Sequence, residues 1–167
     1  MSLLDGIHSP ADLRELPMDQ LPTLAEDIRS RILEVVGRSG GHLTSNLGVT
    51  ELTIALHRVF DFSKDRLLWD VGHQCYPHKL LTGRHERFDT LRKAGGVSGF
   101  PDIHESEYDL FSVGHAGTAV ATAVGMARGD QLLGRDNSVV ALVGDASIVN
   151  GVAVEGLNQA GTLKRQF

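Results

Sequence analysis

The chain has 167 residues, of which 41% are hydrophobic, and a formal net charge of −5 at pH 7. This length suits one domain with a substantial apolar core. The negative charge and the lack of a basic run exclude general nucleic-acid binding, because nothing is available to neutralise phosphates. No apolar stretch approaches the roughly 20 residues that span a bilayer, so no membrane segment is predicted.

Two further features concern the cellular compartment. The first residues, Met1–Pro10, have neither the positive charge nor the long apolar run of a signal peptide. Cys75 is the only cysteine, so the chain cannot form an internal disulfide. We therefore expect the protein to reside in a reducing cytoplasm.

The first part of the chain is predicted to be helical. Ser9 has the character of an N-cap, and Pro10 suits the first helical position after it. Apolar residues at every third or fourth position predict a longer helix, which begins at Pro22 and which Gly40-Gly41 ends. The predicted helices cover about residues 9–16, 22–39 and 48–60.

The second part of the chain alternates short apolar runs with helical patterns. The last apolar run lacks polar alternation, as in a strand covered on both faces. Strands that alternate with helices indicate the α/β class, with a parallel sheet flanked by helices. The predicted strands are 67–71, 110–113 and 138–143, and the predicted helices are about 117–133 and 150–160.

Each predicted strand ends in a glycine followed by a polar residue. The three pairs are Gly72-His73, Gly114-His115 and Gly144-Asp145. Ligands of open parallel sheets bind beyond the carboxyl ends of the strands, and a glycine there lets the backbone approach them closely. The N–H groups at the start of a following helix suit phosphate. We therefore predict phosphate-binding turns at 114–118 and 144–147.

Asp145 conflicts with a simple phosphate site, because a carboxylate repels phosphate. A divalent cation resolves the conflict, since Mg²⁺ is commonly held by one or two carboxylates together with phosphate oxygens. The alternative is an aspartate that caps the following helix. The sequence contains neither a P-loop motif nor G-x-G-x-x-G, so a nucleotide site of those kinds is not predicted.

The histidines fall into two groups. His42, His73 and His115 each follow a glycine at an expected helix or strand end, where neutral imidazole can donate or accept a hydrogen bond. A structural role is the alternative for each of the three. We expect His57, within a helix, to be structural, and His78 to be a surface or helix-start residue.

A zinc site at residues 73–78 is not favoured. His73, Cys75 and His78 are all possible zinc ligands. Structural zinc normally needs four ligands, with a second paired cluster, and no such cluster is present in the sequence.

Five motifs occur in a fixed order along the chain, at 40–43, 68–74, 76–79, 98–101 and 105–109. They read GGHL, LWDVGHQ, YPHK, SGFP and ESEYD. In this order they closely resemble the 1-deoxy-D-xylulose-5-phosphate synthase family, which are thiamin diphosphate enzymes of the transketolase superfamily. The resemblance covers nearly the whole chain from about residue 9.

The resemblance implies a site as well as a fold. The family has three α/β domains, and residues 1–167 match the N-terminal part of the first, which binds the cofactor's diphosphate and Mg²⁺. Asp145 is the implied metal ligand, and His42 and His73 are the implied catalytic residues. The implied cofactor-binding residues are His73, Gly114, His115, Ala116, Ala146 and Ser147.

The family reaction is a decarboxylative condensation. Pyruvate loses CO₂ and its two-carbon unit is transferred to glyceraldehyde 3-phosphate, which gives 1-deoxy-D-xylulose 5-phosphate. The product serves isoprenoid (terpenoid), thiamin and pyridoxal biosynthesis. The resemblance implies a cytoplasmic transferase that acts as a homodimer.

The chain departs from the family pattern in two ways. Ala146 replaces a usual glycine and Ala116 a frequent serine, and a Cβ at position 146 would cost roughly 1–2 kcal/mol if that backbone had positive φ. The chain also ends early. Residues 162–167 are expected to lead toward a further strand, while the family's second metal ligand and its activating glutamate lie beyond.

We therefore expect residues 1–167 alone to be inactive, to bind cofactor weakly at best and to expose apolar surface. One alternative is a subunit of a split transketolase-like enzyme, which would need a partner chain that supplies the glutamate. The other is a non-catalytic interaction module.

Overall fold

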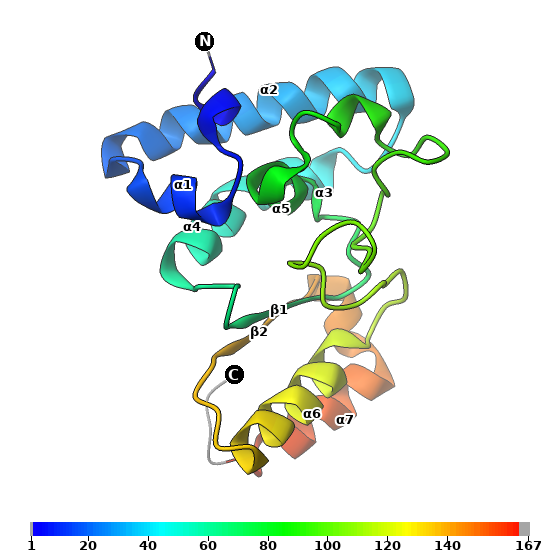
Figure 1. Ribbon diagram of the computed structural model, residues 1–167. Helices are drawn as coiled ribbons and strands as arrows, with labels where there is room; N and C mark the ends of the chain where they lie inside the picture. The colour runs from blue at the N-terminus through cyan, green and yellow to red at the C-terminus, as the bar shows by residue number, and fades with distance from the viewer. Residues whose placement is uncertain (1, 164–167) are drawn as a thin grey trace. The chain divides into compact units, whose positions relative to one another are not determined.

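The computed structural model describes residues 2–163 (Figure 1). The chain divides into two compact units, which we call the helical unit (residues 1–61 and 73–100) and the sheet unit (62–72 and 101–167). The chain thus leaves the helical unit at residue 62 to form one strand of the sheet unit. It then returns to the helical unit for residues 73–100 before it completes the sheet unit.

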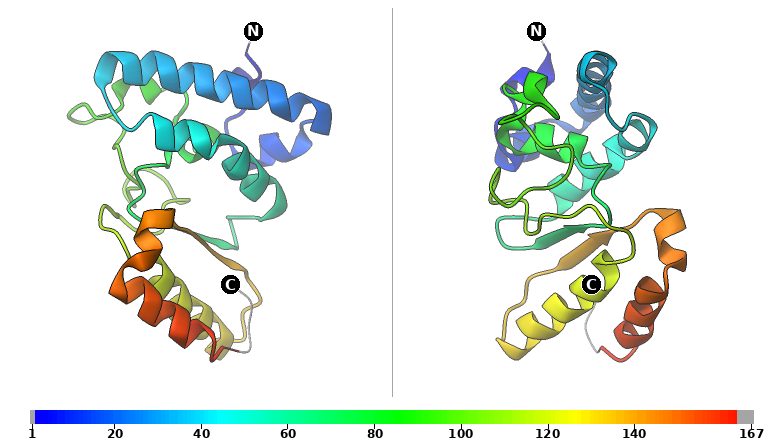
Figure 2. Two further views of the ribbon diagram at one scale, coloured as in Figure 1. Left: turned by 180° about the vertical axis from the view of Figure 1, so that it is seen from behind. Right: turned by 90° about the vertical axis from the view of Figure 1, so that its right-hand side faces the viewer.

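One long helix runs along an edge of the helical unit, and shorter helices lie to one side of it (Figures 1 and 2). Ser9 and Asp12 form a capping box at the start of α1, and Gly40, with φ of 71°, ends α2. Both boundaries confirm the sequence prediction. The elements are η1 (Leu3–Gly6), α1 (Pro10–Glu15), η2 (Met18–Gln20), α2 (Leu21–Ser39), α3 (Thr44–Gly48), α4 (Thr50–Val59), α5 (Tyr76–Lys79), η3 (Leu80–Arg84) and η4 (Phe88–Thr90).

The apolar stripe of α2 forms the core of the helical unit. Its buried residues recur at helical spacing, and α2 contacts α4, α5 and η1 through them. This periodic burial is what the spacing of apolar residues predicted. The buried side chains of α2 are Leu24, Ala25, Ile28, Ile32, Val35 and Val36.

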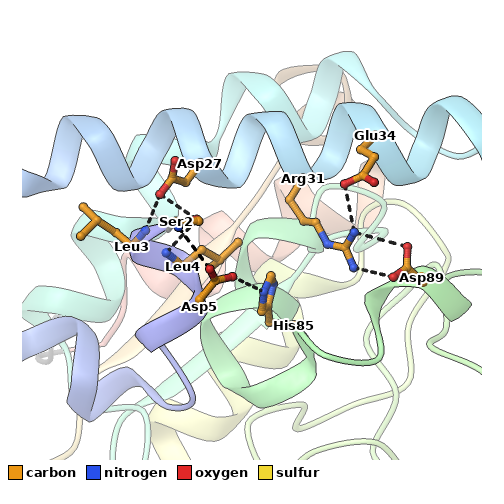
Figure 3. A network of polar contacts seen from close by, with 9 residues as sticks. All are labelled: Ser2, Leu3, Leu4, Asp5, Asp27, Arg31, Glu34, His85 and Asp89. Atoms are coloured by element: carbon orange, nitrogen blue, oxygen red, sulfur yellow. Dashed lines mark hydrogen bonds and ion pairs between the residues drawn. The ribbon is translucent and has the colours of Figure 1, made fainter.

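A polar network fastens the N-terminal segment to α2 (Figure 3). One oxygen of Asp27 accepts hydrogen bonds from Ser2 Oγ at 2.8 Å and from the Leu3 N–H at 2.6 Å. Farther along α2, Arg31 pairs with Asp89 of η4 at 2.8 Å. The surface of α2 therefore holds segments from both ends of the helical unit.

The sheet unit contains two parallel strands and two long helices, with α6 and α7 lying side by side (Figure 2). Arg66 pairs with Val139 and Trp69 with Leu142, and α6 packs on both strands. A Cβ on Gly156 would lie 2.9 Å from the Ala121 nitrogen, so this glycine lets α7 approach α6 closely. The elements are β1 (Arg66–Trp69), α6 (Ala119–Leu132), β2 (Val139–Leu142), η5 (Asp145–Val149) and α7 (Gly151–Ala160).

This architecture confirms the α/β class and the parallel pairing, but one predicted strand is wrong. Residues 110–113 form a loop, in which Ser112 Oγ accepts a hydrogen bond from the Ile103 N–H at 3.3 Å. This segment pairs with neither β1 nor β2, and a short apolar run without a neighbouring strand has no ladder to join. Of the expected lead into a further strand at 162–167, residues 164–167 lie outside the described residues.

Within residues 2–163, none of the helices combines the length and the apolar character needed to cross a membrane.

Candidate functional site

Two of the predicted site residues meet in the helical unit. The rings of His42 and His73 lie edge to face with their centroids 5.2 Å apart, and Phe100 lies against His42 at 5.7 Å. His42 lies shortly after the end of α2, and His73 is the first residue of the helical unit after β1. The structure therefore brings together the two histidines that the resemblance implied as catalytic.

Asn46 joins the two histidine segments. Its side-chain amide Nδ2 donates to the carbonyl oxygen of His42 at 2.6 Å and to that of His73 at 2.9 Å. Its Oδ1 accepts the backbone N–H of Tyr76 at 2.8 Å. Sequence reasoning missed Asn46. Its only local signal is that it lies four residues after His42, close enough to reach back along the first turn of α3.

A close backbone approach precedes His42. Gly41 has φ of 147°, and a Cβ built there would lie 2.9 Å from Tyr76 Oη. The Tyr76 hydroxyl oxygen in turn accepts the His42 N–H at 3.4 Å. A side chain at position 41 would therefore displace the buried tyrosine that supports His42.

Each of the two histidines has a buried ring nitrogen that is unused. Nδ1 of His42 and Nδ1 of His73 form no hydrogen bond with any described residue. Burial is the largest cause that lowers the pKa of His42, and electrostatic repulsion from the neighbouring His73 and Arg92 adds to it. His42 is therefore a neutral imidazole near pH 7, able to accept a proton, and an unpaired buried nitrogen of this kind indicates a place for a ligand.

In the sheet unit, Asp70 caps the start of α6. Its carboxylate, in a residue only 1% exposed, accepts N–H groups of Gly117 at 3.0 Å, Thr118 at 2.9 Å and Ala119 at 3.2 Å. Burial by itself would raise the pKa of Asp70, but these bonds and one from the Ser147 side chain lower it overall. Asp70 is therefore a stable buried anion.

This cap changes the predicted phosphate turn at 114–118. The N–H groups of Gly117 and Thr118 already bind Asp70, so they are not free for phosphate. The N–H groups of Gly114, His115 and Ala116 have no partner in the described part of the chain. The backbone N–H groups of those three residues are therefore the ones that this turn can offer to a phosphate.

The turn at 114–118 lies beside the segment that begins with Asp145. Gly117 has φ of 85°, and a Cβ there would lie 2.4 Å from Asn150 Cγ. Asp70 also binds both the start of α6 and Ser147. The turn before α6 and the segment that follows β2 thus lie next to each other within the sheet unit.

Asp145 is exposed and is the first residue of η5. Its carboxylate caps no helix, and Asn150 instead caps α7 by accepting the Val152 N–H at 3.0 Å. The helix-cap alternative for Asp145 is therefore wrong. Its carboxylate has no partner among residues 2–163 and is available to a cation.

The alanine departures carry no backbone strain. Among the described non-glycine residues, only Val71 and Arg92 have positive φ, at 60° and 61°. Ala116 and Ala146 therefore adopt ordinary backbone conformations, and the cost considered for a Cβ at position 146 does not arise.

The described residues contain no cluster of three or more histidine, cysteine or acidic side chains that could hold a metal ion. His78, expected at the surface or at a helix start, lies within α5 and is fully buried. Its Nδ1 lies 2.9 Å from Nε2 of the buried His57, which agrees with a structural role for His57. A cation at Asp145 would need further oxygen ligands, such as those of a diphosphate.

Comparison with known proteins shows which family the chain resembles. The family model described as 1-deoxy-D-xylulose-5-phosphate synthase matches residues 4–167. The chain is 57% identical over 166 residues to "1-deoxy-D-xylulose-5-phosphate synthase 1" of Geobacter sulfurreducens, covering 99% of this chain and 26% of that protein. It is 55% identical over 161 residues to the synthase of Neisseria meningitidis serogroup C, covering 96% of this chain and 25% of that protein. The chain thus spans about a quarter of the length of the curated relatives it matches.

Proposed function

The chain belongs to the 1-deoxy-D-xylulose-5-phosphate synthase family, and on that premise we propose that it forms the first part of a thiamin diphosphate-dependent synthase. The reaction joins pyruvate to glyceraldehyde 3-phosphate and releases CO₂, giving 1-deoxy-D-xylulose 5-phosphate. The relatives carry this enzyme's name, and the motif order in residues 40–109 supports the same assignment.

The observation that carries the proposal is the unpaired carboxylate of Asp145 beside a turn with free N–H groups. Asp145 would bind Mg²⁺, and Ala146 and Ser147 would contact the diphosphate. Gly114, His115 and Ala116 would supply the neighbouring N–H groups, with His73 as a further cofactor-binding residue. The donor set fits, because Mg²⁺ favours a carboxylate together with phosphate oxygens.

When bound, thiamin diphosphate supplies the electron sink for loss of CO₂ from pyruvate. The chain supplies proton transfer and orientation. His42, neutral because burial and nearby positive charge lower its pKa, can accept a proton from a substrate hydroxyl. His73, whose ring lies against His42, can hold a substrate oxygen through its unused nitrogen.

The localisation, the oligomeric state and the requirement for further domains are also proposed from the family. We propose a cytoplasmic homodimer for the full-length synthase, with activity that residues 1–167 alone do not show. The chain spans about a quarter of its relatives' length, and Asp145 is a single carboxylate that needs further ligands. Turnover by residues 1–167 alone would contradict this part of the proposal.

Calorimetry in the full-length synthase tests the metal assignment. We expect thiamin diphosphate to bind only with Mg²⁺. Asp145→Asn should lower that affinity by more than about 100-fold, the upper end of the loss seen when only a partner of a metal ligand is removed, because here a direct charged ligand is lost. Asp136→Asn is the matched control, because Asp136 is also exposed. Unchanged Mg²⁺-dependent binding in Asp145→Asn would contradict the metal site.

The binding titration and an assay of pyruvate turnover separate the alternatives. A non-catalytic interaction module would bind no thiamin diphosphate with or without Mg²⁺. A subunit of a split enzyme would turn over pyruvate only after addition of a second chain.

A further inference from the structure

We propose that Asn46 is the positioning residue that fixes the spacing of His42 and His73, an inference that rests on the proposed function. The two histidines come from separate segments of the helical unit, far apart in the sequence. The distance between their rings is therefore set by tertiary contacts. Asn46 binds both segments through backbone carbonyl oxygens, not through the histidine rings.

The chemistry of the side chain is specific to an amide. Nδ2 uses both of its hydrogens, one for the His42 carbonyl at 2.6 Å and one for the His73 carbonyl at 2.9 Å. Oδ1 accepts the Tyr76 N–H at 2.8 Å. An aspartate has the same shape but no hydrogens to donate, so it would turn two attractions into repulsions.

Asn46 is itself held rigidly. It is fully buried, its N–H donates to the Leu43 carbonyl at 3.0 Å, and its own carbonyl accepts Thr50 Oγ1 at 3.0 Å. Its side chain cannot follow the histidine segments if they move. It therefore defines a fixed point from which both segments are placed.

The histidine rings depend on this fixed point because their own bonds do not orient them. Nδ1 of each ring lacks a partner among the described residues. The described contacts that orient the rings are the position of each backbone, the edge-to-face contact between them at 5.2 Å and the contact of Phe100 with His42 at 5.7 Å. The groups that set the proton affinity of His42 are the His73 ring, the charge of Arg92 and the surrounding burial, and all depend on that placement.

Two variants and a matched control test the proposal. Asn46→Ala removes all three side-chain bonds, and Asn46→Asp keeps the shape but removes the donors. Thr53→Val is the control. Thr53 is fully buried too, but its hydroxyl donates only to the Val49 carbonyl of its own helix, at 2.8 Å.

The first measurement is an NMR titration of the histidine rings in residues 1–167, with no cofactor or substrate. We expect the His42 pKa to rise toward the ordinary histidine value in Asn46→Ala and to rise further in Asn46→Asp, where a carboxylate is added. Thr53→Val should leave the His42 titration unchanged while it lowers the midpoint of thermal unfolding. A His42 titration that does not move in either Asn46 variant would overturn the proposal.

The second measurement is steady-state kinetics in the full-length synthase. We expect both Asn46 variants to lower kcat about 10- to 100-fold with KM changed less than about threefold, because misplaced catalytic groups cost rate more than binding. The acid limb of the pH profile should shift with the His42 pKa. Unfolding of both Asn46 variants while Thr53→Val stays folded would make Asn46 a structural residue and overturn the proposal. Lack of activity in the unmodified synthase would instead refute the proposed function, and the cofactor-free titration would still stand.

Discussion

The two units position their functional segments with opposite chemistry. In the helical unit the groups to be held are carbonyls, and the neutral amide of Asn46 donates to them. In the sheet unit the groups to be held are N–H groups at the start of α6, and the anion of Asp70 accepts from them. The comparison teaches that a helix start, with its partial positive charge, favours a buried carboxylate, whereas two buried carbonyls can be joined by a neutral amide that adds no charge to the interior.

Loss of Asp70 should break the sheet unit's arrangement and have the largest effect on stability. Asp70→Ala leaves the N–H groups of Gly117, Thr118 and Ala119 without their acceptor, so we expect about 3 kcal/mol of destabilisation. Asp70→Asn keeps an acceptor oxygen but no charge, and should cost about half as much. Urea unfolding followed by circular dichroism measures both.

The ordering of these two variants is the informative result. If Asp70→Asn costs as much as Asp70→Ala, the charge rather than the hydrogen-bond acceptor stabilises the helix start. If neither variant differs from the unmodified chain by more than about 0.5 kcal/mol, Asp70 does not hold the turn.

The units should also differ in their response to acid. Burial lowers the pKa of His57 well below its ordinary value, and the charges of His78, Arg14 and Arg84 add to this. Because the unfolded chain takes up the His57 proton more readily, the stability that this pair contributes is present above pH 6.5 and is lost as the pH falls below it. The loss approaches about 1.4 kcal/mol per pH unit for one histidine.

Asp70 is an anion, and its contribution to stability is lost over a lower range of pH. Its pKa is lowered in the folded chain, so its contribution is present above the ordinary aspartate value, near 4, and is lost below it. Between pH 7 and 5 we therefore expect the protection factors of amide hydrogens, which correct for the slower intrinsic exchange at low pH, to fall in α4 and α5 and to stay high in the first turn of α6. An equal fall in protection in both regions would contradict this assignment of buried charge.

Local sequence signals predicted the longer helices and both observed strands but not these contacts. The capping residues around Pro10 and the apolar spacing of α2 are read from neighbouring positions, and both were confirmed. The bond from Gly117 to Asp70 spans 47 residues, and that from Asn46 to His73 spans 27. No propensity or periodicity encodes such pairs.

The same distinction explains the error at residues 110–113. Four residues of strand-like composition do not form a strand unless a neighbouring strand offers backbone partners, and that depends on the fold as a whole. Likewise the pairing of His57 with His78 could not be inferred from either helix alone, because the two residues lie 21 positions apart on different helices.

The smallest expected effect concerns position 146, where the resemblance implied a glycine and the chain has an alanine. Strain at Ala146 would make Ala146→Gly stabilising. The backbone there lacks positive φ, so the substitution should instead cost up to about 1 kcal/mol, because glycine gains freedom in the unfolded chain. Thermal unfolding of residues 1–167 measures this difference. A higher midpoint in Ala146→Gly would mean that the Cβ of Ala146 strains the turn after Gly144. The exposed position of the Asp145 carboxylate would then require a strained backbone.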